Sequence, residues 1–325
     1  MGFVGKCGVP EYKNHQKILT PISASLDVPF LRNERLGYHY TGIEKFKSIV
    51  SSRQLWLSSL ADVNDSAEIA DGASVFADFA LKFPERAKRD SEWWKNLVNE
   101  TVESELAEYF VFCLTLDEDS HPMWELYAGN GGCCIGFNYS ELVHSLLEKN
   151  FETLKGGEIS YGMVVYDYRD KIRIFKTYMK ACGNAVSVAL ANVFNTFAEE
   201  TAIKSPRWVE AYSYYENEAE KVRNFAIGLP EFAFFKNRTF AYENELRIAV
   251  RIPKERQEAL EKLGRIRREG SRRFLCLDFD LARSIKRIYS ALKATRVQRD
   301  EILCTMEAAE GLKNVRFWTS SSTIR

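Results

Sequence analysis

The sequence lacks paired cysteines, long apolar runs and net charge. Its seven cysteines are odd in number and form no Cys-x-x-Cys pair, so neither a disulfide framework nor a zinc site follows. No stretch approaches the length of a membrane span, and residues 1–20 lack the continuous apolar core of a signal peptide. These absences favour a cytoplasmic protein without a membrane partner.

Charge and composition further restrict the kinds of partner that the sequence favours. Lys plus Arg and Asp plus Glu each number 45, so no overall field draws the chain to nucleic acid or to an acidic membrane. The densest basic run is 265–273, which we interpret as a solvated loop because no aromatic residues interleave with its arginines. Hydrophobic residues make up 46% of the 325 positions, enough for a substantial core.

Strands and helices are interspersed irregularly, which favours an α+β fold over a regular series of strand–helix–strand units. Residues 1–35 predict an N-terminal arm, and 36–325 predict a single α+β domain with a helical insertion at 171–229. The periodicity predicts strands at 37–41, 54–58, 109–116, 133–138, 162–168, 232–235, 246–252, 274–279 and 315–318. It predicts helices at 42–52, 67–81, 84–109, 140–149, 253–263 and 295–310, and a helical turn at 123–127.

The most informative segment is 242–247, where two carboxylates and a guanidinium alternate with other residues. Side chains alternate between the two faces of a strand, so Glu243, Glu245 and Arg247 are expected on the face opposite the apolar stripe that begins at Leu246. Lys236 lies just upstream and could neutralise a carboxylate or bind a phosphate. The array predicts either a functional site or a salt-bridge ladder on the sheet surface, which would contribute little to stability.

Two further groups each have a functional and a structural interpretation. His39 and Thr41 share one face of a strand, where an imidazole and a hydroxyl can bind a ribose; the alternative is a core histidine with a satisfied hydrogen bond. Trp124 and Tyr127 are three residues apart on a helical turn, where their rings could stack on a nicotinamide. The alternative is that both rings pack beneath the glycine-rich turn at 129–132.

A metal site has weaker support. Asn64, Asp65 and Glu68 could act as ligands, but a turn followed by a helix N-terminus explains the Asn-Asp pair, and we favour the turn. The segment 129–132 has neither the spacing of a dinucleotide-binding loop nor the Lys-Ser/Thr of a phosphate loop, so we interpret it as a hairpin turn. We therefore assign no metal ligand.

Five motifs in order along 36–252 resemble a bacterial and phage family known as a domain of unknown function. They are Tyr38-His39-Tyr40-Thr41, Asn64-Asp65-x-x-Glu68, Trp124-x-x-Tyr127-Ala128, Gly132-x-x-Ile135-Gly136-Phe137 and Tyr242-Glu243-x-Glu245-x-Arg247. That family is in turn remotely similar to the ADP-ribosyltransferase superfamily, which has a His-x-Thr on its first strand, a short second strand ending in Ser and a glutamate on a late strand. The resemblance implies a split mixed β-sheet core with surrounding helices, and NAD as the substrate.

The resemblance also implies roles for individual residues. Glu245 would be the catalytic glutamate and Glu243 would deprotonate the acceptor, although the two roles can be exchanged. The implied NAD-binding residues are His39, Tyr40, Thr41, Ser58, Trp124, Tyr127, Lys236 and Arg247.

The leading functional hypothesis is an ADP-ribosyltransferase-like enzyme that uses NAD to modify a macromolecule or cleaves NAD, as a toxin or an anti-phage defence effector. Its partners would be NAD, a protein or nucleic-acid acceptor and an antitoxin protein. The first alternative is a non-catalytic nucleotide-sensing or protein-interaction module. The second is a metal-dependent hydrolase or nuclease that uses His39, Asp65 and Glu68.

Overall fold

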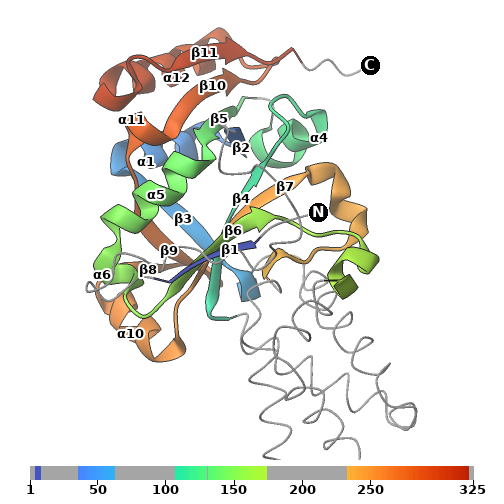
Figure 1. Cartoon of the computed structure of the whole chain (residues 1–325). Coiled ribbons are helices and arrows are strands. Elements are labelled where there is room, and N and C mark those ends of the chain that lie inside the picture. The colour runs from blue at the N-terminus through green and yellow to red at the C-terminus, as the bar shows by residue number, and fades with distance from the viewer. Residues whose placement is uncertain (1–3, 9–35, 63–106, 130, 174–232, 322–325) are drawn as a thin grey trace, which may run out of the picture. The chain divides into compact units, whose positions relative to one another are not determined.

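The computed structural model describes residues 4–8, 36–62, 107–129, 131–173 and 233–321 (Figure 1). The chain divides into two compact units. The first consists mainly of Asn64–Ala107 and Val165–Arg238, and the second of Gly2–Val63, Glu108–Val164 and Thr239–Arg325. The second unit contains every described strand, so the fold and the candidate site are described within it.

The described strands form one mixed sheet of eleven strands, which confirms the expected α+β class. All neighbouring strands are antiparallel except β10 and β11, which are parallel. The strands are β1 (Val4–Gly8), β2 (Leu36–Thr41), β3 (Gln54–Ser59), β4 (Tyr109–Thr115), β5 (Cys133–Asn138), β6 (Glu158–Met163), β7 (Glu245–Arg251), β8 (Ile266–Glu269), β9 (Arg272–Asp278), β10 (Ile285–Ser290) and β11 (Arg316–Thr319).

The sheet branches at β4. Along one edge β4 pairs with β7 over its full length, from Tyr109↔Arg251 to Thr115↔Glu245 (Figure 1). Along the other edge it pairs with two strands, with β3 near its start and with β2 at its end. One branch continues as β2-β5-β10-β11 and the other as β3-β9-β8.

Helices connect and cover the strands of the second unit. The described α-helices there are α1 (Ile43–Ser52), α4 (His121–Met123), α5 (Tyr139–Lys149), α6 (Phe151–Leu154), α10 (Lys254–Lys262), α11 (Leu281–Ser284) and α12 (Arg296–Ala308). The π-helix η3 (Trp124–Ala128) follows α4 without a break. Short 3-10 turns are η1 (Leu60–Asp62), η5 (Arg238–Glu243) and η6 (Glu310–Leu312). The side chain of Asn138 caps α5, and Thr295 with Gln298 forms a capping box on α12.

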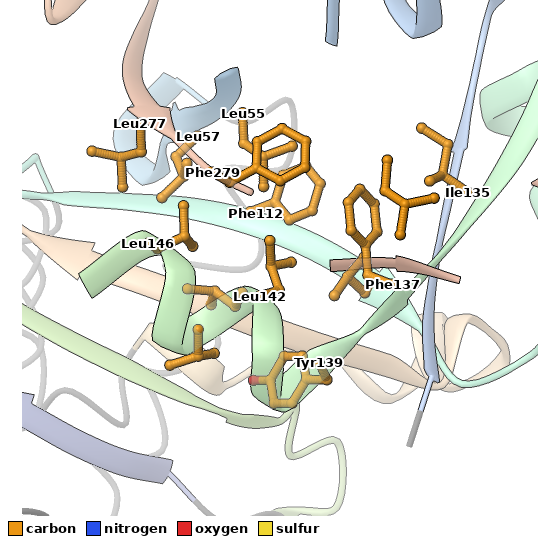
Figure 2. Packing of buried hydrophobic residues seen from close by; sticks show 14 of the residues in the cluster. Leu55, Leu57, Phe112, Ile135, Phe137, Tyr139, Leu142, Leu146, Leu277 and Phe279 are labelled. Atoms are coloured by element: carbon orange, nitrogen blue, oxygen red, sulfur yellow. The ribbon is translucent and has the colours of Figure 1, made fainter. Parts of the chain in front are cut away.

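The described part of the second unit has two clusters of buried apolar residues, and the larger one, called the hydrophobic core here, combines side chains of the strands with those of α1, α5 and α12. Figure 2 shows Leu142 and Leu146 of α5 packing toward apolar side chains of β3, β4, β5 and β9. The ring of Phe137 lies edge-on to Phe112 and to Phe279, with both centroid separations at 6.0 Å. Such edge-to-face ring pairs add to the free energy gained from area burial.

Most predicted elements of the second unit are confirmed to within two residues. The strands expected at 37–41, 54–58, 109–116, 133–138, 246–252, 274–279 and 315–318 are β2, β3, β4, β5, β7, β9 and β11. The helices expected at 42–52, 140–149, 253–263 and 295–310 are α1, α5, α10 and α12. Most of them have the apolar periodicity of a buried face, which is the strongest secondary-structure signal in a sequence, whereas β11 has no buried residue.

Other expectations differ from the structure. The basic run 265–273 is not a loop: it forms the β8–β9 hairpin, which turns at Gly270 with φ of 60°. The strand expected at 162–168 is β6, four residues earlier, and among the described residues 233–235 only Phe235 makes a β-bridge, to Val165. Strands β1, β8 and β10 were not expected; β1, in the expected N-terminal arm, pairs with β6. The predicted helix at 67–81, most of the one at 84–109 and the insertion beyond 173 lie outside the described residues.

Candidate functional site

The two faces of the sheet have different roles. Residues opposite each other on neighbouring antiparallel strands project to the same side, and Tyr38, Thr115 and Glu245 are linked by such pairs across β2, β4 and β7. Their neighbours Leu114 and Leu246 project to the other side, into the hydrophobic core. We call the side opposite the core the outer face. It carries Tyr38, Tyr40, Trp56, Ser58, Val111, Cys113, Thr115, Glu245, Arg247 and Ala249.

Glu245 and Arg247 form a buried ion pair on the outer face. The Nε atom of Arg247 donates to Oε1 of Glu245 at 2.6 Å, and each side chain is 2% exposed. The pair follows from the sequence, because residues two apart on a strand share a face. A buried carboxylate is costly unless a partner supplies the opposite charge, and the guanidinium does so here. The expected salt bridge is therefore present, but in the interior instead of on an exposed surface.

Strand alternation does not extend to Glu243. This residue ends η5, and Asn244 has the left-handed φ of 43°, so β7 begins only at Glu245. Asn244 ties the start of β7 to the loop after β4, because its Nδ2 donates to Oδ1 of Asp117 at 3.2 Å and its carbonyl accepts from Leu116 N at 3.1 Å. Asn is among the few residues that adopt this backbone region readily.

Tyr127 connects η3 to Glu243. Its hydroxyl donates to Oε1 of Glu243 at 3.0 Å, while 49% of Tyr127 remains exposed. Glu243 itself is buried. In this arrangement the half-exposed ring can contact a flat ligand, and the carboxylate beside it can accept a proton from a neighbouring donor.

Trp124 is placed differently from Tyr127, so the two rings do not form one aromatic surface. Trp124 is buried, lies edge-on to Tyr40 with a centroid separation of 4.9 Å, and donates from Nε1 to Oδ1 of Asp119 at 2.7 Å. The Tyr40 hydroxyl donates to the carbonyl of Asp117 and accepts from Ser120 N, both at 2.9 Å. Trp124 and Tyr40 therefore hold the loop after β4 in place.

His39 and Thr41 lie on the core side of the sheet, opposite Glu245. The His39 ring packs on Phe112 with a centroid separation of 4.7 Å, and Nδ1 lies 3.2 Å from the carbonyl oxygen of Cys113. Burial lowers the pKa of His39 to about 4, and the bond to Cys113 only partly offsets that effect. Thr41 is buried. This is the arrangement of a core histidine with a satisfied hydrogen bond.

The remaining two candidates are Ser58, on another strand of the sheet, and Lys236, in the first unit. Ser58 lies on the outer face of β3, where it pairs with Val111 of β4. Lys236 belongs to the first unit, where it is buried and its carbonyl accepts from the Nζ of Lys171 at 2.8 Å. The structure therefore brings Glu245, Arg247 and Ser58 to one sheet face, places Tyr127 on Glu243, and describes Lys236 only within its own unit.

The acidic loop after β4 was not singled out from the sequence, yet it organises this region. Oε2 of Glu118 accepts from the hydroxyl of Tyr38 at 2.9 Å, from Arg287 at 2.8 Å and from the hydroxyl of Tyr289 at 3.2 Å. Burial and the bond to Glu118 raise the pKa of Tyr38 well above its usual value. The available signal was three consecutive acidic residues directly after a buried strand.

Asp119 fastens the end of the chain to the same loop. Besides Trp124, its carboxylate accepts from the hydroxyl of Ser320 at 2.5 Å and from the backbone N and hydroxyl of Ser321 at 2.8 and 2.9 Å. Burial raises the pKa of Asp119, but the bonds from Ser320, Trp124 and Ser321 outweigh it and leave the pKa below its usual value. Asp119 is thus a positioning residue for the loop.

The described part of the chain shows neither a candidate metal site nor a candidate membrane-spanning helix. No group of three His, Cys, Asp or Glu side chains there could hold a metal ion, while Asp65 and Glu68 lie outside that part. The same residues contain no helix that is both long and apolar enough to cross a bilayer. The residues that carry the candidate site are Glu243, Glu245, Arg247 and Tyr127.

Residues 123–248 match a family described as protein of unknown function (DUF2971). The match begins one residue before Trp124 and ends one residue after Arg247, so it includes Tyr127, Glu243 and Glu245. The expected resemblance to a family of unknown function is thereby confirmed. Searches of curated proteins and of solved structures each found no match.

Proposed function

We propose that this protein is an ADP-ribosyltransferase-like enzyme that cleaves NAD, or transfers its ADP-ribose to a macromolecule, with Glu245 as the catalytic carboxylate. The supporting observation is the Glu245–Arg247 pair on the outer face, at the end of the β4–β7 ladder where the sheet branches. A carboxylate at a fixed position is the group that an oxocarbenium-like transition state requires.

The proposed reaction breaks the bond between the ribose C1′ and the nicotinamide nitrogen. The bonding electron pair leaves with the nicotinamide, which becomes neutral, and positive charge develops on the ribose. The carboxylate of Glu245 stabilises that charge, and an acceptor group or water then attacks C1′ and loses a proton. Arg247 keeps the carboxylate at a fixed position, and it offers a guanidinium to the diphosphate when the pair separates.

Glu243 and Tyr127 are the proposed second pair. Glu243 accepts the proton of the acceptor, and the hydroxyl of Tyr127 holds its carboxylate at 3.0 Å. The exposed ring of Tyr127 is the surface on which nicotinamide stacks. Trp124 is not part of this stack because its ring and its Nε1 are both used within the framework.

Two features of the geometry modify the roles expected from the resemblance. His39 and Thr41 project into the core, so on this proposal they support the sheet and Ser58 is the hydroxyl candidate on the outer face. Glu245 and Arg247 are each 2% exposed, so catalysis requires the pair to become accessible when NAD binds. A toxin or anti-phage role, with an antitoxin as partner, remains part of the proposal.

The second candidate function is a non-catalytic nucleotide-sensing or protein-interaction module. Such a module would also bury the Glu245–Arg247 pair, because a buried pair can serve structure alone. Labelled NAD distinguishes the two. Transfer of label to components of a cell lysate by the wild type, but not by Glu245→Gln, supports the enzyme. Binding of NAD with neither transfer nor nicotinamide release supports the sensor, and the absence of binding contradicts both the enzyme and the NAD sensor.

A further inference from the structure

Aromatic and basic side chains meet on the outer face of the second branch of the sheet. Ser58 of β3, Phe274 of β9 and Arg267 of β8 are direct partners across three neighbouring strands. Trp56 lies two residues before Ser58 and therefore projects to the same side. The neighbouring residues Leu57 and Leu275 belong to the hydrophobic core.

The two rings and the guanidinium contact one another. The centroids of Trp56 and Phe274 are 5.7 Å apart with an interplanar angle of 45°. The guanidinium carbon of Arg267 lies 5.5 Å from the centroid of the Trp56 ring. Both rings are partly exposed and Arg267, which lies over the Trp56 ring, is exposed, so solvent reaches all three side chains.

The β8–β9 hairpin sorts the arginines of the basic run between the two faces. Arg268 and Arg273 project away from the rings and pair with Glu261 and Asp62. The arginines on the side of the rings are Arg265, Arg267 and Arg272, and the carboxylates on that side are Asp278, which pairs with Arg265, and Glu269. Glu269 lies opposite Arg272 in the hairpin, so this side carries three arginines against two carboxylates, an excess of one positive charge.

We propose that Trp56, Phe274, Arg267 and Arg272 form a stacking surface that binds single-stranded nucleic acid. Unpaired bases stack on aromatic rings and on guanidinium planes regardless of their sequence, and arginines beside them contact phosphates. A duplex hides the faces of its bases, so it cannot use the rings in this way. The aromatic residues absent from the basic run itself are supplied by the neighbouring strands β3 and β9.

The stacking surface lies on the same face of the sheet as the proposed catalytic pair. Ser58 pairs with Val111 of β4, Val111 pairs with Ala249 of β7, and Ala249 shares its side with Arg247. A strand bound at the stacking surface would thus lie on the outer face, where Glu245 lies. Its role as the acceptor of ADP-ribose rests on the proposed function, whereas its binding does not.

The test measures binding without NAD. The full chain is titrated into fluorescein-labelled single strands of about 12 nucleotides, DNA and RNA, and polarisation is recorded. Arg267→Gln is compared with Arg268→Gln, which removes the same charge from the next residue on the opposite side of the hairpin. We expect Arg267→Gln to weaken binding by about fivefold to tenfold and Arg268→Gln by less than about twofold.

Phe274→Leu is a second test variant, which removes an aromatic ring without changing any charge. It is expected to weaken binding of the single strand by about tenfold, with thermal unfolding measured in parallel to confirm that the sheet is intact. Three results would overturn the proposal: no binding by the wild type, equal losses for Arg267→Gln and Arg268→Gln, or equally tight binding of a duplex of the same length. Because NAD is absent, failure of the catalytic proposal leaves this outcome unaffected.

Discussion

Arg247 donates from Nε to Oε1 of Glu245 at 2.6 Å, and solvent reaches only 2% of either side chain. The two residues lie on β7, an internal strand between β4 and β6. A second glutamate–arginine pair joins Glu108 to Arg251 at the other end of β7, where Arg251 is 27% exposed. β7 therefore contributes one arginine to a buried pair and another to a more exposed pair, which makes matched controls available.

Removal of the arginine alone is expected to leave a buried, uncompensated carboxylate. Arg247→Met should lower the free energy of unfolding by about 3–5 kcal/mol, and the double variant Glu245→Gln/Arg247→Met by clearly less. Urea denaturation measures both. Arg251→Met should cost only about 1–2 kcal/mol, because Glu108 keeps its hydrogen bond from Lys254 N and water reaches the Arg251 side of that pair. Equal losses for Arg247→Met and Arg251→Met would show that burial does not control the energetics of the Glu245 pair.

Gly132 tests the close approach of the glycine-rich turn to β2. A Cβ at this position would collide with the backbone carbonyl oxygens of Ala128 and Thr41, which cannot rotate away as a side chain can. Gly132→Ala should therefore cost about 2 kcal/mol or more of the free energy of unfolding. Gly42→Ala is the control, because no atom lies within 4 Å of the position that its added methyl group would take and its φ is −72°. It should change stability by less than about 1 kcal/mol.

His39 is expected to make stability depend on pH. Its pKa is about 4 in the folded protein and 6.5 for an unperturbed histidine, so the unfolded state takes up the proton first as pH falls. Stability from the neutral ring is complete above about pH 6.5 and is lost as pH falls toward 4. Between about pH 7.5 and about pH 5 the wild type should lose about 2 kcal/mol more than His39→Gln, measured by urea denaturation. Parallel pH profiles for the two proteins would contradict a neutral His39 in the folded protein.

Tyr127→Phe separates the two steps of the proposed reaction. The substitution keeps the ring but removes the hydroxyl that holds Glu243, so transfer to an acceptor should fall by about tenfold while nicotinamide release changes by less than about threefold. Tyr242→Phe is the control, because Tyr242 is similarly exposed at 44% and lies next to Glu243 in the sequence. Equal effects of the two substitutions on transfer would remove the positioning role of Tyr127.

The sequence predicted the elements that have strong apolar periodicity. β4, β5 and β7 bury their alternate residues in the core, and α1 and α5 have apolar residues at helical spacing. β8 was missed because only Ile266 of its four residues is buried, so the hairpin has the composition of a charged loop. Pairing with β9 outweighs the local composition there.

The candidate site was predictable only where strand alternation holds. Glu245 and Arg247 share a face as expected, but the left-handed backbone at Asn244 removes Glu243 from the strand. His39 and Glu245 both lie on strands, but the side of the sheet to which each projects depends on the register across β2, β4 and β7. Register between strands distant in sequence is set by packing and cannot be derived from either strand alone.

Nicotinamide release from NAD by the wild type, Glu245→Gln and Glu108→Gln is the most direct test of the catalytic role of Glu245. Both substitutions replace a buried glutamate that is paired with an arginine of β7, so a general effect on folding would appear in both and in their thermal unfolding. We predict release by the wild type and by Glu108→Gln, and a loss of about 100-fold or more in Glu245→Gln. Release by Glu245→Gln at the rate of Glu108→Gln, or no release by the wild type, would contradict it.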